Sequence, residues 1–161
     1  MSRVYTVGSG GIALANADVT LVFINPGTTH SIEILRAWAS QSANATSAQQ
    51  RVQLVTQVTA FPTLTTYTPR KHRLSDPASV IVGGTTGAAG TSGINASAEG
   101  AGAKSVILED AFNVLNGWLW VPTENETIIL NASAASGFGL YFPVAALTLT
   151  NWAFGVTFRE L

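Results

Sequence analysis

The chain has 161 residues, a formal net charge of −1 and only 11% charged residues, compared with about 25% in ordinary soluble domains. This length suits one domain with a core large enough to fold alone, and the absence of cysteine excludes disulfides and thiolate metal sites in this chain. The near-neutral charge argues against a general nucleic-acid binder. Because charged residues normally cover solvated surface, their scarcity predicts a surface rich in Ser, Thr and Asn, or one partly hidden against protein partners.

The sequence also predicts no membrane span and no secretory signal. No run of 18 apolar residues occurs, and a transmembrane helix needs about that length. Residues 1–5 lack a basic start followed by an apolar stretch and a cleavage site. We therefore expect neither a membrane nor secretion to be part of its function.

Alternation of apolar and polar residues with a period of two dominates the chain and predicts short β-strands. After a weak strand over 4–7, the first strong one covers 19–23 and ends at the turn Asn25-Pro26-Gly27, in which Pro fixes φ and Gly permits a positive φ. The later predicted strands cover residues 31–40, 51–58, 64–67, 80–82, 105–112, 117–121, 127–132, 144–150 and 152–160.

Residues 83–104 interrupt this pattern with Gly, Ala, Ser and Thr, and predict a long loop that has too few large side chains to form a core. No Gly-Lys-Ser/Thr and no helix follow the glycines, so a phosphate-binding loop is rejected. We interpret residues 1–18 as an N-terminal arm or first strand, and residues 19–161 as one β-sandwich domain that carries the loop.

Many short strands without alternating helices predict an all-β fold, a jelly-roll-like antiparallel β-sandwich. An immunoglobulin-like sandwich is the second choice, because the usual cysteine pair is missing.

The titratable residues predict no catalytic site, and we expect the protein not to be an enzyme. His72, Ser75 and Asp76 lie within five residues, whereas a hydrolase triad is assembled from separated elements, and no Gly-X-Ser-X-Gly motif is present. His30 is interpreted as a polar loop residue. No calcium loop and no His-Glu-X-X-His motif appear, so we expect no metal, no cofactor and no small-molecule substrate.

Two sets of residues are candidates for binding a partner. The cationic run Arg70, Lys71, His72 and Arg73 suits an acidic protein surface, although it equally suits a solvated loop. Trp118 and Trp120 fall on one face of a predicted strand. Core packing is the simplest interpretation, but an exposed pair would anchor a subunit interface or stack on sugars. A carbohydrate-binding domain of a receptor-binding or tail component is therefore the alternative function.

Five segments together carry a resemblance to a known family. They are a short N-terminal strand at 4–7, a Trp-bearing strand at 34–38, the basic stretch 67–79, the Trp-rich segment 112–122 and an alternating strand that ends at 157–161. The pattern resembles the small jelly-roll decoration (cement) proteins of tailed-bacteriophage capsids.

The resemblance implies a homotrimer that binds a major capsid protein on the outer surface of the virion and stabilises the head, without catalysis or a cofactor. The resemblance does not assign a binding role to any individual residue of this chain. A separate hypothesis concerns Val4 and Tyr5, since the segment 1–18 that contains them could reach a neighbouring subunit by strand addition.

Overall fold

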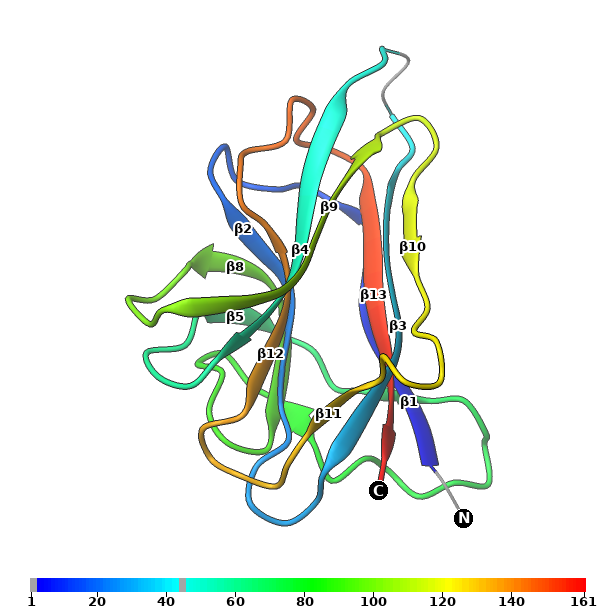
Figure 1. The fold of residues 1–161 in the computed structure, drawn as a ribbon, viewed down its shortest axis with the longest axis vertical. Helices are drawn as coiled ribbons and strands as arrows, with labels where there is room; N and C mark the ends of the chain where they lie inside the picture. The colour runs from blue at the N-terminus through cyan, green and yellow to red at the C-terminus, as the bar shows by residue number, and fades with distance from the viewer. Residues whose placement is uncertain (1–2, 44–45) are drawn as a thin grey trace.

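The protein is a sandwich of two antiparallel β-sheets packed face to face (Figure 1). The structure, a computed structural model, describes residues 3–43 and 46–161, and these contain no helix. The predicted all-β sandwich is confirmed. Sheet A consists of β1 (Arg3–Ile12), β3 (Ile32–Gln41), β6 (Arg70–Lys71), β10 (Trp118–Trp120), β11 (Ile128–Leu130) and β13 (Trp152–Glu160). Sheet B consists of β2 (Val19–Asn25), β4 (Gln49–Gln57), β5 (Thr63–Thr66), β7 (Val82–Gly83), β8 (Thr91–Ala98), β9 (Lys104–Asn113) and β12 (Gly137–Phe142).

The order of strand pairing is that of a jelly roll. β1 pairs with β13, β2 with β12, β3 with both β10 and β11, and β4 with β9. Successive pairs alternate between sheets A and B, so the chain behaves as one long hairpin rolled into two layers. The roll is completed where β13 lies beside β3 and β12 lies beside β4.

Alternation along the strands places one apolar face of each sheet in the core. On β13, for example, Phe154, Val156 and Phe158 are buried against the opposite sheet. At one end of the core the Trp152 ring meets the Phe142 ring edge-to-face, with centroids 5.0 Å apart.

Residues 58–103, between β4 and β9, form an insertion that extends both sheets. Its strand β8 pairs with β2 and widens sheet B, and its strand β6 pairs with β1 and widens sheet A. The prediction of one long loop over 83–104 is therefore wrong, because β8 lies within it. Small residues are required there: a Cβ at Gly93 would lie 2.7 Å from the Leu64 Cβ and 2.8 Å from the Gly84 carbonyl oxygen.

Two further differences lie near the C-terminus. β12 was not among the predicted strands, yet it is a central strand of sheet B. Gly137 has no room for a side chain, since a Cβ there would overlap the Cζ atom of Phe23. The strand expected over 144–150 is absent, and that segment is a connection from β12 to β13.

The N-terminal segment is the first strand of its own domain and not an arm. β1 pairs with β13 over most of its length, and β6 covers its other edge at Tyr5 and Thr6. The pairing of β1 within sheet A of its own subunit gives no support to strand addition by this segment to a neighbouring subunit, which stays a hypothesis.

The close packing of Gly137 gives a test of sheet B. We expect Gly137→Ala to lower the free energy of unfolding by about 1–3 kcal/mol, because the added methyl group must displace Phe23 or the backbone of Gln57. Gly10→Ala is the matched control: its Cβ meets nothing closer than 3.7 Å, so stability should change by less than about 0.5 kcal/mol. Urea denaturation measures both, and equal effects would contradict this packing.

Candidate functional site

Exposed apolar side chains gather on the flank of the sandwich formed by β9, β10, β11 and their connections, which we call the β9–β11 flank. The edge strands of both sheets border this flank. β9 is the last strand of sheet B, and β10 and β11 pair with β3 at the edge of sheet A. The exposed side chains are those of Val106, Ile107, Leu115, Leu119, Val121 and Ile129.

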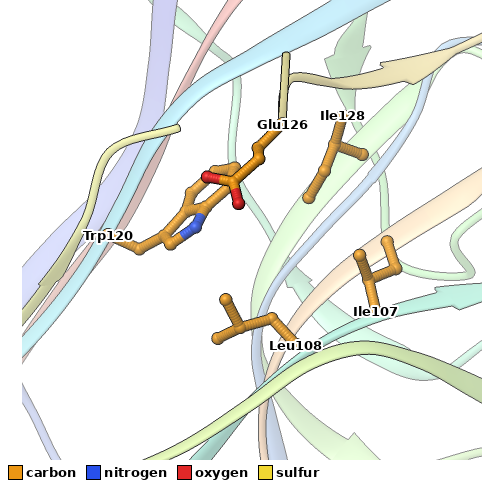
Figure 2. Close-up of a pocket in the computed structure, with 5 residues that line it drawn as sticks. All are labelled: Ile107, Leu108, Trp120, Glu126 and Ile128. Atoms are coloured by element: carbon orange, nitrogen blue, oxygen red, sulfur yellow. The ribbon is translucent and has the colours of Figure 1, made fainter. Parts of the chain in front are cut away.

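A groove of about 270 Å³ opens on this flank, between β9 of sheet B and β10–β11 of sheet A. In Figure 2, Ile107 and Leu108 lie on one side of it and Trp120 on the other, with Ile128 at one end. Glu126, whose side chain is exposed, also lines the groove. The groove is thus apolar inside and carries one acidic group at its opening.

The two tryptophans do not form the exposed pair that sugar stacking requires. Trp118 is 9% exposed, and its indole nitrogen donates a hydrogen bond to the Asp110 carboxylate at 3.0 Å. Trp120 is half-buried and lines the groove. Trp118 is therefore a core residue, and Trp120 is the member of the pair that contributes to a surface feature.

The cationic run lies at the opposite edge of sheet A, where β6 borders β1. Arg70 Nε donates to the Tyr67 hydroxyl at 3.0 Å, and His72 Nε2 lies 2.6 Å from the Thr6 hydroxyl. The backbone N–H of His72 donates to the Val4 carbonyl oxygen at 3.1 Å. Arg70, Lys71, His72 and Arg73 are all exposed, whereas Tyr5 is completely buried and cannot touch a partner.

Polar groups continue from His72 across the outer face of sheet A. The Thr6 hydroxyl lies 3.0 Å from that of Thr157, which also accepts a bond from Arg36 Nε at 3.1 Å. These contacts hold the cationic edge rigidly against the sheet and bring no carboxylate to His72. Nothing in them assembles a hydrolase triad.

His30 lines a surface pocket together with Arg3, Glu160 and Leu161, and its Nδ1 lies 3.1 Å from the Thr29 hydroxyl. Within residues 3–43 and 46–161, no cluster of three or more His, Asp or Glu side chains could hold a metal ion. The same part of the chain contains no helix that could cross a membrane.

A charged network on sheet B fixes the insertion in place. Glu99 accepts hydrogen bonds from the backbone N–H and hydroxyl of Thr20, at 2.6 and 2.5 Å, and forms an ion pair with Lys104 at 3.2 Å. The Lys104 ammonium lies 4.7 Å from the centre of the Tyr141 ring, whose hydroxyl donates to Asp18. Because each charge has a partner, we interpret this cluster as structural.

Sequence reasoning identified the cationic run but missed most of the groove. Ile107, Leu108 and Ile128 lie in short apolar runs that are typical of buried strands, so their pattern gave no sign of a surface feature. Glu126 was not among the predicted binding residues. The sequence feature that could have indicated the groove was the combination of aromatic, aliphatic and acidic residues in 105–130.

Comparison with known proteins adds no relative: no family model, no curated protein and no solved structure matches the chain.

Because the charged network on sheet B contains the Tyr141 hydroxyl, we expect the folded protein to lose stability at alkaline pH. Burial, followed by the hydrogen bond to Asp18 and its charge, raises the pKa of Tyr141 above its ordinary value of 10.0. Because the folded protein holds this proton more tightly, its contribution to stability is complete below pH 10 and is lost as the pH rises further. We expect the free energy of unfolding to fall above pH 10, and to fall less steeply in Tyr141→Phe.

Urea denaturation at several values between pH 7 and pH 11 measures this dependence. Some decline should persist in the variant, because burial also raises the pKa of Tyr5. Identical slopes in the two proteins would contradict the assignment to Tyr141.

Proposed function

We propose that the protein is a structural subunit that assembles as a homotrimer and decorates the outer surface of a tailed-phage head, which it stabilises by binding the major capsid protein. It acts without catalysis, cofactor, nucleic acid or small-molecule substrate. The observation that carries the proposal is the β9–β11 flank, where exposed aliphatic side chains lie on the strands and connections that border an apolar groove, in a chain with very few charges.

Burial of such a flank favours association with protein. Apolar surface gains roughly 25 cal/mol for each Å² removed from water, so isolated aliphatic side chains matter little while a group of them favours an interface. Interfaces between identical subunits are more apolar than average surface and have few charges at their centre. The composition of the chain and the placement of its apolar residues therefore support the same kind of contact.

The fold supports the same conclusion more weakly. A jelly roll hosts many functions, including viral capsid domains and lectins, so it does not select one. Sugar binding is the less favoured choice because Trp118 is buried and Trp120 is turned into the groove. The resemblance of the sequence to capsid decoration proteins then makes a capsid the preferred assembly.

The flank can be tested by placing a charge on it. Ile129 is exposed and lies opposite Glu33 on the outer face of sheet A. We expect Ile129→Lys to weaken trimer formation at least tenfold, about 1.4 kcal/mol, while the fold remains intact. Val58→Lys is the control, because Val58 is equally exposed but lies outside the flank.

Light scattering and mass photometry measure the oligomer, and cosedimentation with undecorated heads of the virus that encodes the chain measures decoration. A wild-type protein that neither self-associates at micromolar concentration nor binds heads would refute the proposal.

A further inference from the structure

A leucine in the turn that follows β6 is almost entirely exposed. Leu74 keeps 92% of its surface in solvent, more than any other large apolar side chain that the structure describes. Exposed leucines are common singly, so exposure alone carries no function. Leu74 differs because it directly follows the cationic run that ends at Arg73.

Hydrogen bonds hold this turn in one shape. The Lys71 ammonium donates to the carbonyl oxygens of Leu74 and Asp76, at 2.8 and 2.9 Å. The Asp76 backbone N–H donates to the Arg73 carbonyl oxygen at 3.1 Å, and β6 is fixed to β1. Leu74 is therefore displayed on a rigid support, so docking it would require little further ordering.

The groove on the β9–β11 flank has the size and lining to accept such a side chain. Its volume of about 270 Å³ exceeds the roughly 150 Å³ of an apolar cavity that binds benzene. It is smaller than the roughly 300–1,000 Å³ of pockets for drug-sized ligands. Aliphatic and aromatic walls therefore suit one inserted apolar side chain.

The charges around the two features are opposite in sign. Arg70, Lys71 and Arg73 accompany Leu74, whereas Glu126 lines the groove and Glu124 lies in the same connection. Across the described part of the chain, the ion pairs involve Arg51, Lys104 and Arg159, so none of these five side chains forms an ion pair there. Complementary potentials of this kind set the register and orientation of a contact.

The two features also lie apart on the molecule. In Figure 1 the green segment that follows β6 loops out beside the start of β1, whereas the groove lies between β9 and the β10–β11 strands. β6 and β10 occupy opposite ends of sheet A. One subunit therefore presents both halves of a contact that it cannot make with itself.

We propose that Leu74 of one copy inserts into the groove of a second copy, with Arg70 and Arg73 facing Glu124 and Glu126 of that copy. This head-to-tail contact rests on the proposed function, for which it supplies the subunit interface. Such contacts join different surfaces of two copies and close into a ring when the rotation between subunits allows. In the proposed trimer, three identical contacts complete the ring.

The first test places a charge on the inserted side chain. Leu74→Asp should weaken self-association at least tenfold in mass photometry, with an unchanged circular dichroism spectrum because the side chain is exposed in the single subunit. Leu147→Asp is the matched control, since Leu147 is an 80% exposed leucine with no cation beside it in the sequence. Equal effects of the two substitutions would overturn the proposal.

The second test exchanges the charges. Arg73→Glu and Glu126→Arg should each weaken self-association, and the double variant should recover most of it because the pair is restored with reversed sign. Additive losses in the double variant would overturn the contact between these groups.

The third test uses the lack of native cysteine. Leu74→Cys and Ile107→Cys proteins, mixed and treated with a short bis-maleimide, should give a crosslinked dimer between the two variants. Neither variant alone should give this product in quantity.

The outcomes of these tests separate the two proposals. A stable wild-type trimer without the crosslink overturns the Leu74 contact and leaves the trimer standing, whereas a monomeric wild type that does not bind heads refutes both. If Leu74→Asp abolishes head binding and leaves the trimer intact, Leu74 contacts the capsid protein, and insertion into a second copy is overturned.

Discussion

The rolled pairing of the strands is the constraint on which the rest of the structure depends. Pairing β1 with β13 and β2 with β12 places the ends of the chain in the interior of the two sheets. The middle of the chain must then supply the outer strands β9, β10 and β11. Since β9 belongs to one sheet and β10 and β11 to the other, the sandwich stays open between them, and the groove lies at that opening.

An open flank between two sheets exposes side chains that the core would otherwise cover. Ile107 and Leu108 show how this happens: β9 has an irregularity beside β4, where Leu54 pairs with Leu108 and Val55 with Val106. The extra residue, Ile107, is left unpaired and lines the groove. Bulges commonly re-aim a side chain at the edge of a sheet, and here the result is an exposed apolar side chain beside the groove.

The insertion between β4 and β9 forms the edge of sheet A that lies opposite the β9–β11 flank, and this edge is cationic. β6 pairs Arg70 and Lys71 with β1, and the contacts of His72 with Val4 and Thr6 fix the rest of the cationic run beside them. The network of Glu99, Lys104 and Tyr141 fixes the other end of the insertion to sheet B. A charge-poor molecule thus concentrates cations at one edge and apolar side chains with carboxylates at the other, an arrangement suited to directed assembly.

The sequence by itself determined the sandwich class, most strands and the cationic run, because these depend on local alternation and on neighbours in the chain. Only the tertiary structure decided that the glycines of β8 and β12 are strand residues, since the reason is the closeness of Leu64 and Phe23. The tertiary structure likewise buried Trp118 and left Trp120 at a groove, although both share one face of β10. Alternation predicts which face a side chain takes, whereas its exposure depends on where the opposite sheet ends.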